Sequence, residues 1–454
     1  MELISIKEIS TACGGKFFGP PEVAGQKTTA IKIDSRKIEA GDVFIAVIGQ
    51  NLDGHNYIDS ACKNGALCVI SERAVDGRPH ILVGSTLQAI KDIAEHYRKK
   101  FDIPVIGITG SVGKTTIKEM VYHVLSSKYS VLKTRGNLNN EFGLPQMVFD
   151  LNFKHDVAVL EMGMNNFGEI SRLSKVARPD IAVISNIGEA HIGNLGSRDG
   201  ILKAKCEIFD YMNKDGRVFL NGDDDKLVSL RGSDFNAVFF GINKSNDIFV
   251  KQILGADENG TRLIACYYDE QIEIYIPKAG EYMIYPALVA LGIAKSLSLT
   301  NEQIVDGIGS YEGVGSRNKI IKTERLTIVD DVYNACKASI IAGVNTLKDM
   351  KTDGKKVAII GDVFELGEFS EKIHFEIGQA LTHLDVDIVI CVGKDAYFID
   401  KAIRLESDKK SMHYESQDEM LLELASFIDD DDIVYVKASR DMAFENTVSY
   451  LENL

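Results

Sequence analysis

The sequence predicts an α/β protein of three domains: a small α/β N-terminal domain, a central domain built on a parallel sheet, and a C-terminal Rossmann-like domain. The chain has 454 residues, which is too long for a single hydrophobic core. Short, continuous apolar runs alternate with helical patterns, as they do in buried parallel sheets. Residues 236–276 interrupt this alternation with short strands joined by turns. We expect the domains to cover residues 1–100, 101–315 and 316–454.

The first hundred residues contain short strand-like runs separated by turn-rich stretches. Residues 42–47 (DVFIAV) and 66–70 (ALCVI) are two such runs. A helical pattern over residues 87–97 follows them, and three basic residues end it. Residues 98–104, which include a proline, then form the expected linker. These features predict a small α/β domain ahead of the linker.

Residues 105–116 read VIGITGSVGKTT, an apolar run that enters a glycine-rich turn and then a helical pattern. The glycines let the backbone approach a phosphate, and the amides at the start of the helix point their positive ends toward it. A lone Gly-Lys-Thr is more often an ordinary turn, but the strand before it and the amphipathic helix after it favour phosphate binding. The expected nucleotide-binding residues here are Gly110, Ser111, Gly113, Lys114, Thr115 and Thr116.

Polar residues follow two other apolar runs of the central domain. Residues 157–160 (VAVL) lead into Glu161, and residues 181–184 (IAVI) lead into Ser185 and Asn186. In an open parallel sheet, ligands gather beyond the carboxyl ends of the strands. We therefore expect these polar side chains to lie near the phosphate loop, in a central domain that binds a nucleotide.

The strands expected within 236–276 form an antiparallel addition to the central domain. Beyond them the alternation of apolar runs and helical patterns resumes, which predicts the third, Rossmann-like domain from residue 316. Its expected strands lie at residues 327–329, 357–360, 388–390 and 433–436.

The composition is that of an ordinary soluble protein, with 45% apolar and 26% charged residues. A net charge of −15 argues against nucleic acid or a membrane surface as a partner. No apolar run approaches the roughly 20 residues that span a bilayer, and the opening MELISIKE is unlike a signal peptide. We expect no membrane insertion and a cytoplasmic location. The seven cysteines form no CxxC pair, so neither a disulfide framework nor a zinc site is indicated.

Five groups of motifs combine with the phosphate loop. Together they resemble the Mur ligases, ATP-dependent amide-forming enzymes of bacterial cell-wall synthesis, and the resemblance covers nearly the whole chain. Three of them, in the first domain, at 134–145 and at 361–367, resemble the branch of the family that adds a dipeptide. The groups are DSRK at 34–37 with GDVFIA at 41–46 and DGH at 53–55; TRGNLNNEFGLP at 134–145; LEMGM at 160–164; NIGEAH at 186–191 with AKCEIF at 204–209; and DDVYNA at 330–335 with GDVFELG at 361–367 and KASR at 437–440.

The resemblance implies an ATP- and magnesium-dependent ligase that adds D-alanyl-D-alanine to a UDP-N-acetylmuramoyl tripeptide in peptidoglycan precursor synthesis. The γ-phosphate of ATP moves to a carboxylate, and the amine then attacks the acyl phosphate and expels phosphate. A carboxylate is repelled by the triphosphate, so cations must lie between them, and two magnesium ions are implied. The partners implied are these small molecules, and the family implies a monomer.

The resemblance also implies roles for individual residues. Thr115 and Glu161 match the ligands of the nucleotide-bound magnesium ion, and His191 matches a ligand of the second ion. Lys205 matches a lysine that many Mur ligases carry as a carbamate, an anionic oxygen ligand suited to magnesium. The catalytic set is completed by Lys114 and by Arg317, which would reach the γ-phosphate. The alternatives are a solvated carboxylate for Glu161, a structural role for His191 and a surface lysine for Lys205.

The substrate-binding residues implied by the resemblance lie in two regions. Five first-domain residues match the stretches that hold the uridine diphosphate. The alternative for Arg36 is a salt bridge on the surface of the domain. Three asparagines would bind the sugar and peptide parts, with an Asn-rich turn as the alternative. These residues are Ser35, Arg36, Asp53, Gly54 and His55, and Asn137, Asn139 and Asn140. In the last domain Asp331 would accept from the ATP ribose and Tyr333 lies beside it, so the site would be completed by domain closure.

The chain departs from the family pattern near the expected nucleotide and amine sites. Val112 replaces an asparagine of the loop, Tyr282 and Pro286 replace a histidine and an asparagine near the adenine, and Cys336-Lys337 replaces Asn-Pro. These departures leave two alternatives open. One is a Mur-type ligase that joins another carboxylate and amine in a specialised pathway, which the first-domain stretches oppose. The other is a nucleotide-binding paralogue without turnover.

Overall fold

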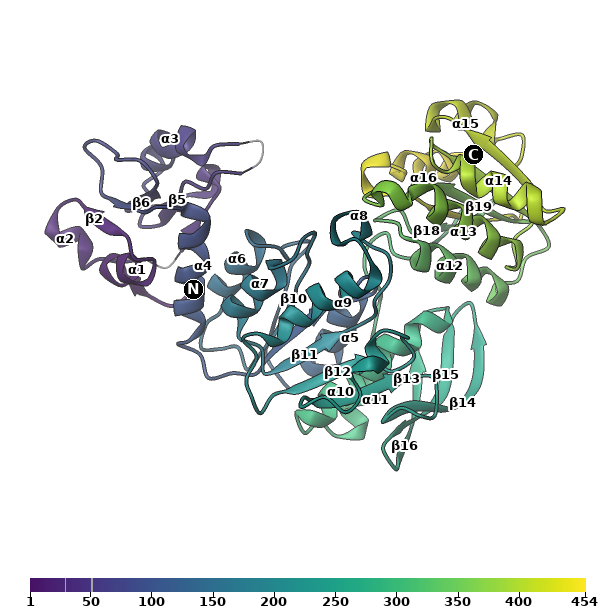
Figure 1. Cartoon of the computed structure of the whole chain (residues 1–454), viewed down its shortest axis with the longest axis horizontal. Helices are drawn as coiled ribbons and strands as arrows, with labels where there is room; N and C mark the ends of the chain where they lie inside the picture. The colour runs from purple at the N-terminus through teal and green to yellow at the C-terminus, as the bar shows by residue number, and fades with distance from the viewer. Residues whose placement is uncertain (29, 50–51) are drawn as a thin grey trace. The chain divides into compact units, whose positions relative to one another are not determined.

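The computed structural model describes residues 1–28, 30–49 and 52–454. The predicted α/β class is confirmed, because helices alternate with strands along the chain and the described residues form four sheets (Figure 1). The backbone divides into two compact units. The first is Met1–Thr109 with Tyr129–Val183 and Cys206–Arg217, and the second is Gly110–Lys128 with Ile184–Lys205 and Val218–Leu454. The predicted domain boundaries stay a prediction.

The N-terminal part of the first unit is built on a five-stranded sheet of order β2-β7-β6-β5-β4. Strands β4 to β7 are parallel, and β2 is antiparallel to β7. The expected runs at 42–47 and 66–70 are β5 and β6, and the helix expected at 87–97 is α4. The elements are β1 (Ile4–Ser5), α1 (Ile6–Ala12), β2 (Lys16–Phe18), α2 (Pro21–Ala24), β3 (Lys27–Thr28), β4 (Ile31–Lys32), η1 (Ser35–Lys37), β5 (Val43–Ile45), η2 (Gly54–Tyr57), α3 (Ile58–Lys63), β6 (Cys68–Ser71), β7 (His80–Leu82) and α4 (Thr86–Arg98).

A nine-stranded sheet of order β16-β15-β14-β13-β12-β11-β8-β10-β9 lies at the centre of the chain. Strand β8 leads into the phosphate loop, and β10 and β11 are the two other apolar runs that the sequence predicts. The elements are β8 (Val105–Thr109), α5 (Lys114–Ser126), β9 (Val131–Lys133), α6 (Gly143–Phe149), β10 (Val157–Glu161), α7 (Glu169–Ala177), β11 (Ile181–Ile184), α8 (Ile192–Leu195), α9 (Arg198–Cys206), β12 (Arg217–Asn221), β13 (Asn236–Gly241), β14 (Ile248–Asp257), β15 (Gly260–Tyr267), β16 (Glu270–Ile276), α10 (Ile284–Ser296) and α11 (Asn301–Gly309).

The prediction of an antiparallel addition over 236–276 is partly wrong. Strands β14, β15 and β16 are antiparallel, but β13 pairs parallel with β14. The reason lies in the connection between them, which folds around Asp223. Its carboxylate accepts from the amide of Ile242 and from the side chains of Asn243 and Asn246. The folded connection brings β14 beside the end of β13 without reversing the direction of the chain.

The C-terminal part of the second unit is a six-stranded sheet of order β17-β18-β22-β19-β20-β21. Strand β17 is the antiparallel edge, and the other strands are parallel, as a Rossmann-like domain requires. Helices α15 and α16 pack on one face, and α12 and α13 lie on the other (Figure 1). The elements are β17 (Lys319–Lys322), β18 (Thr327–Asp330), α12 (Lys337–Asn345), β19 (Lys356–Gly361), α13 (Ser370–Thr382), β20 (Ile388–Val392), α14 (Tyr397–Glu406), β21 (Lys410–Tyr414), α15 (Gln417–Leu424), β22 (Ile433–Lys437) and α16 (Glu445–Glu452).

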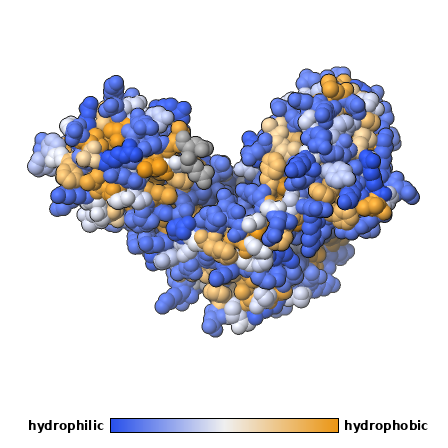
Figure 2. Space-filling view, turned by 45° about the horizontal axis from the view of Figure 1, so that its top comes forward, coloured by the Kyte–Doolittle hydropathy of each residue, from blue (hydrophilic) through white to orange (hydrophobic). Residues whose placement is uncertain are grey.

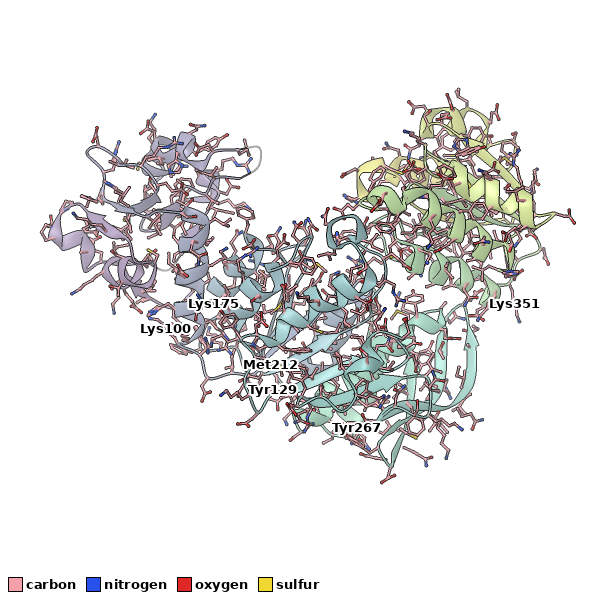
Figure 3. The ribbon with its side chains drawn as sticks, in the orientation of Figure 1. Lys100, Tyr129, Lys175, Met212, Tyr267 and Lys351 are labelled. Atoms are coloured by element: carbon pink, nitrogen blue, oxygen red, sulfur yellow. The ribbon has the colours of Figure 1, made fainter. Side chains whose placement is uncertain are left out.

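The apolar runs that the sequence predicts as buried strands are buried in the structure. Strands β8, β10 and β11 are buried along their whole length. Figure 2 shows a mainly hydrophilic face with smaller apolar areas, and Figure 3 shows the side chains on the backbone, with Lys175 on α7 and Tyr267 at the end of β15. No helix in the described part of the chain is both long and apolar enough to cross a membrane.

A partly buried ion network in the first unit joins α4 to the segment before α6 and to α7. The carboxylate of Glu141 accepts from Lys91 at 2.6 Å and from two nitrogens of Arg172 at 2.5 and 3.0 Å. Burial alone would raise the pKa of Glu141, but the hydrogen bonds from Arg172 and Lys91 outweigh it and hold the pKa below its usual value. The ionised carboxylate therefore stabilises the folded state.

Replacing Glu141 by glutamine is expected to lower the free energy of unfolding near pH 7 by about 1–3 kcal/mol. A carboxylate whose pKa is lowered by folding stabilises the folded state at pH values above its pKa in the unfolded chain, which is about 4.3. That stabilisation is lost as the pH falls through its pKa in the folded state. The difference between Glu141→Gln and the parent chain should therefore shrink below about pH 4. Urea unfolding followed by circular dichroism measures it. The exposed-turn variant Asp76→Asn is the control, and an equal loss in both variants would contradict the prediction.

Candidate active site

The phosphate loop has the backbone conformation that the glycine pattern predicts. Gly110 has a φ of 147° and Gly113 a φ of 84°, and Gly113 is the residue before α5. A Cβ on Gly110 would lie 1.8 Å from the Oγ of Ser185, so this position has no room for a side chain. Because Gly113 has no side chain, none of its atoms caps the first-turn amides of α5. The start of this helix can therefore present its amides to an anion.

Ser185 and Asn186, which follow β11, hold the loop in this shape. Asn186 donates from its Nδ2 to the carbonyl of Val112 at 3.1 Å, and its Oδ1 accepts from the amide of Val112 at 2.9 Å. Its carbonyl accepts from the amide of Ser111. The hydroxyl of Ser185 donates to the carbonyl of Val112. The prediction that Ser185 and Asn186 lie near the phosphate loop is confirmed.

Two lysines of the predicted catalytic set belong to the same compact unit. Lys114 donates from Nζ to the carbonyl of Gly110 at 2.8 Å, within the loop itself. Lys205, on α9, has a side chain in the core, with 2% of the residue exposed. Burial lowers the pKa of Lys205 well below its usual value, and the charge of Lys114 lowers it further. The surface-lysine alternative for Lys205 is therefore wrong.

Thr115 and Thr116 occupy the first turn of α5. Thr115 is buried, with 6% of the residue exposed, and Thr116 is partly buried. Their position directly after Lys114 is the one that a phosphate loop gives to its hydroxyl residues.

Glu161 ends β10 and lies opposite Ile108 of β8 in the parallel register. It is 3% exposed, so the alternative of a solvated carboxylate is wrong. Its Oε1 accepts from the Nδ2 of Asn139 at 2.9 Å. Asn140 instead forms a turn before α6, in which its side chain accepts from the amides of Phe142 and Gly143, and Asn137 is exposed. The Asn-rich segment thus forms a turn and also supplies, through Asn139, a hydrogen-bond donor to Glu161.

His191 lies at the start of α8 with a φ of 64°. Its Nδ1 is 2.7 Å from the Oε2 of Glu365, and the interaction with His191 holds the pKa of Glu365 below its usual value. Glu365 belongs to the GDVFELG motif of the C-terminal sheet, and its carbonyl also accepts from the amide of Gly193. Two motifs far apart in the sequence therefore meet at this histidine.

Asp331 follows β18 and is fixed by two residues of the neighbouring strand β22. Its Oδ2 accepts from the hydroxyl of Tyr435 at 2.8 Å and from Nζ of Lys437 at 2.6 Å. Sequence reasoning assigned no role to Tyr435 or Lys437, although the KASR motif contains the lysine. The parallel pairing of β18 and β22 places the residues that end each strand side by side, and this pairing is seen only in the fold. Arg317 lies over the ring of Tyr333, with 4.2 Å between the guanidinium carbon and the ring centre.

The DGH motif of the first domain is folded onto itself. Asp53 accepts from the backbone and ring of His55, and these bonds lower the pKa of Asp53 to about 2. The Nε2 of His55 accepts from the amide of Glu72. A Cβ on Gly54 would lie 2.6 Å from the carbonyl of Val47, so a glycine is required there. The motif therefore builds the turn itself.

Ser35 and Arg36 lie in η1 of the same domain. Ser35 is buried, and its carbonyl accepts from the side chain of Asn64. Arg36 is exposed and forms a two-bond contact with Asp34, with both distances 2.9 Å. The structure thus contains the surface ion pair that the sequence left open as the alternative for Arg36.

The departures from the family pattern are accommodated locally. Tyr282 accepts from the side chain of Asn318, the residue after Arg317, at 2.8 Å. Pro286 lies in the first turn of α10, where a missing amide hydrogen costs no helical bond. Val112 contributes backbone groups alone to the loop contacts described above. These departures leave the helix and the loop intact.

The residues fit a phosphate and a magnesium ion to different degrees. Gly110, Gly113 and Lys114 form a cradle of amides and charge, which fits a nucleotide phosphate. Thr115 and the buried Glu161 offer the hard oxygen donors that magnesium prefers. Among the described residues, no group of three or more His, Cys, Asp or Glu side chains is arranged to hold a metal. The ligands predicted for magnesium include a threonine and a lysine, which are not among these four residue types.

A phosphate loop that follows a strand in the parallel part of a sheet, together with a Rossmann-like sheet that has a fixed aspartate at its strand ends, is typical of a nucleotide-binding α/β protein. The sequence matches the Mur ligase family catalytic domain over residues 27–108, the Mur ligase middle domain over 108–294, and the Mur ligase glutamate ligase domain over 316–440. The chain belongs to the Mur ligase family.

The relatives cover nearly the whole chain. The UDP-N-acetylmuramoyl-tripeptide–D-alanyl-D-alanine ligase of Bacillus subtilis is 35% identical over 93% of this chain and 92% of its own length. The enzyme of the same name from Escherichia coli is 31% identical, over 99% and 98%. Crystal structures are similar throughout: MurF of Acinetobacter baumannii has a TM-score of 0.93, 30% identity and full coverage of both chains. MurF ligase of Thermotoga maritima in complex with ADP has a TM-score of 0.84, 30% identity, and covers 93% of this chain and 97% of its own.

Proposed function

We propose that this chain is an ATP-dependent ligase that adds D-alanyl-D-alanine to a UDP-N-acetylmuramoyl tripeptide in the synthesis of peptidoglycan precursors. The observation that carries the proposal is the phosphate loop, where Gly110, Gly113 and Lys114 form an anion cradle in a chain similar throughout to ligases of that name. The tripeptide carboxylate takes the γ-phosphate of ATP and becomes an acyl phosphate. The dipeptide amine then attacks the acyl carbon, forms the amide and releases phosphate.

The ligand and substrate roles of individual residues form part of this proposal. Thr115 and Glu161 would hold the nucleotide-bound magnesium ion, His191 would hold the second, and a carbamylated Lys205 would supply a further oxygen ligand. Bound magnesium neutralises charge between the triphosphate and the carboxylate. The roles assigned to the other residues are binding and orientation. Arg317 would hold the γ-phosphate, and Asp331 and Tyr333 would hold the nucleoside. The residues that would hold the acceptor are Ser35, Arg36, Asp53, Gly54 and His55 of the first domain, and Asn137, Asn139 and Asn140.

The proposal extends to the organisation of the protein. Residues 1–100 bind the uridine nucleotide end of the acceptor, 101–315 bind ATP, and 316–454 complete the ligase site. The protein acts as a monomer in the cytoplasm on small-molecule substrates, without nucleic acid.

A Mur-type ligase for another carboxylate and amine is the second candidate. It is favoured by Cys336 and Lys337, which stand in the motif after Asp331 where the dipeptide-adding branch usually has Asn-Pro. A changed motif at this position alters the surroundings of the incoming amine and so bears on which amine is selected.

Mass spectrometry of the reaction product tests the proposal and separates the candidates. The chain is incubated with ATP, magnesium, the UDP-linked tripeptide and D-alanyl-D-alanine, and we expect a product that has gained one dipeptide and lost one water. Phosphate release should require both the acceptor and the amine. L-alanyl-L-alanine and free D-alanine are the matched amine controls. A product with another amine alone would favour the second candidate, and no turnover with any of a broad panel would favour a nucleotide-binding paralogue.

A further inference from the structure

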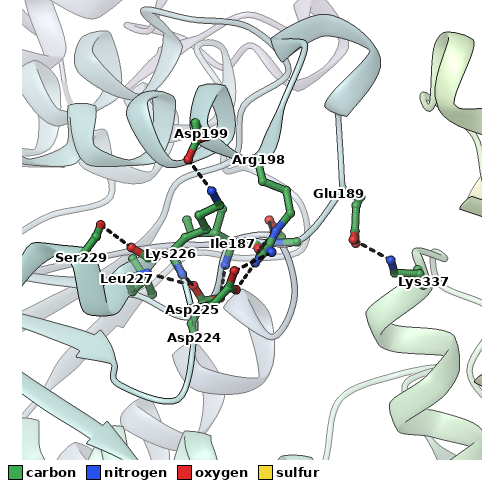
Figure 4. Close-up of polar contacts among 12 residues, drawn as sticks. Ile187, Glu189, Arg198, Asp199, Asp224, Asp225, Lys226, Leu227, Ser229 and Lys337 are labelled. Carbon is green, nitrogen blue, oxygen red and sulfur yellow. Dashed lines mark hydrogen bonds and ion pairs between the residues drawn. The ribbon is translucent and has the colours of Figure 1, made fainter.

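Lys337, the first residue of α12, lies between two carboxylates of the second compact unit. Its Nζ is 2.8 Å from the Oε1 of Glu189 and 2.7 Å from the Oε2 of Glu376. Glu189 belongs to the loop between β11 and α8, and Glu376 lies on α13. Figure 4 shows the contact between Lys337 and Glu189, whose residues come from different parts of the fold. One cation thus ties the loop before His191 to two helices of the C-terminal sheet.

The three side chains are shielded enough for this contact to matter. Lys337 has 22% of its side chain exposed, Glu189 17% and Glu376 33%. Burial alone would lower the pKa of Lys337, but hydrogen bonds to Glu189 and Glu376 outweigh it and raise the pKa. The lysine therefore stays charged, and solvent screens its ion pairs less than those of a fully exposed pair.

The loop that carries Glu189 is anchored at its other end by different residues. The carbonyl of Ile187 accepts from two nitrogens of Arg198 at 3.0 and 2.7 Å, and its amide donates to Asp224 at 2.7 Å (Figure 4). These contacts hold the start of the loop to the central elements. Lys337 holds Glu189 two residues further on, and the next contact along the chain is that of His191 with Glu365. His191, the proposed magnesium ligand, therefore lies two residues beyond the contact of Glu189 with Lys337.

We propose that Lys337 is a positioning residue, which holds the loop 187–191 against α12 and α13 and thereby sets the position of His191. Lys337 acts through the loop and does not itself touch the reacting groups. This inference rests on the proposed function for the role of His191, but the hold on the loop is a physical property that can be measured without substrate.

Hydrogen exchange of the peptide 186–196 measures the hold directly. In Lys337→Met we expect this peptide to exchange about 5- to 30-fold faster, the loss expected for charge-assisted hydrogen bonds. The matched control is Lys372→Met, because Lys372 also faces Glu376, at 3.9 Å, but its side chain is 76% exposed and it lies on α13 itself. The control should leave the exchange of 186–196 unchanged. Glu376→Gln, a second variant from the opposite side of the lysine, should also speed the exchange.

Kinetics distinguish positioning from a general loss of structure. Lys337→Met should lower kcat about 5- to 30-fold while the KM for ATP stays within about twofold, since the phosphate loop is not altered. Lys337→Arg should keep most of kcat, because a guanidinium can pair with both carboxylates. Unchanged exchange in Lys337→Met, or equal effects in Lys372→Met, would overturn the inference, as would faster exchange with an unchanged kcat. Absence of turnover in the parent chain would instead overturn the proposed function, and the exchange would still decide whether Lys337 holds the loop.

Discussion

Replacing Lys114 by alanine is expected to lower kcat/KM by about 10³-fold, as the loss of a cation that stabilises a transferring phosphoryl group does in other enzymes. Its ammonium group lies in the loop, 2.8 Å from the carbonyl of Gly110, at the start of α5. No other residue of that turn carries a full positive charge, since the turn reads GSVGKTT. The variant should therefore also bind ATP more weakly, which isothermal titration measures.

The matched control for this prediction is Lys128→Ala. Lys128 is exposed, follows the other end of α5, and donates to the carbonyl of Ser298. Both variants remove one positive charge near the same helix, so a difference between them reports on position and not on net charge. Circular dichroism should show that both variants fold. If Lys114→Ala retained the full rate of phosphate release, the phosphate site assigned to the loop would be wrong.

The sequence predicts most of the buried architecture because buried parallel strands leave a continuous apolar pattern. The runs 157–160 and 181–184 are β10 and β11, and the helix expected at 87–97 is α4. Edge strands leave no such pattern. Strand β17 reads KIIK and β21 reads KSMHY, and neither is buried along its length. These two strands were not predicted, and their pairing is decided by the neighbouring strand.

The sequence predicts which types of residue form the candidate site, but it does not predict which side chains contact one another. The TGSVGKTT stretch predicts the backbone conformation of the loop, because glycines are needed where φ is positive. The partners of a charged side chain depend on what the fold brings near it. Arg36 pairs with Asp34, two residues away, whereas Lys437 reaches Asp331 across 106 positions of sequence. Glu365 and His191 likewise meet because the fold places their loops together.

Lys205 is expected to carry a carbamate in the folded enzyme, and its replacement by methionine is expected to lower kcat by about 10²-fold or more. Its amine is buried, and burial together with the charge of Lys114 lowers its pKa, which favours the neutral amine that reacts with carbon dioxide. The nitrogen lone pair attacks the carbon of carbon dioxide, one proton leaves the nitrogen, and the product is an anion. A buried anion close to the cation of Lys114 is better compensated than a buried ammonium group in the same place.

Carbon-13 NMR of the enzyme equilibrated with labelled bicarbonate tests this prediction independently of turnover. The parent chain should show a carbamate resonance that Lys205→Met lacks and that Lys203→Met keeps, because Lys203 is an exposed lysine of the same helix. Methionine is apolar and similar in length, so Lys205→Met should unfold at the same temperature or a higher one. A loss of activity without a loss of stability then identifies a chemical role for the lysine. No labelled resonance in the parent chain, together with full activity in Lys205→Met, would show that Lys205 is a buried lysine of the core.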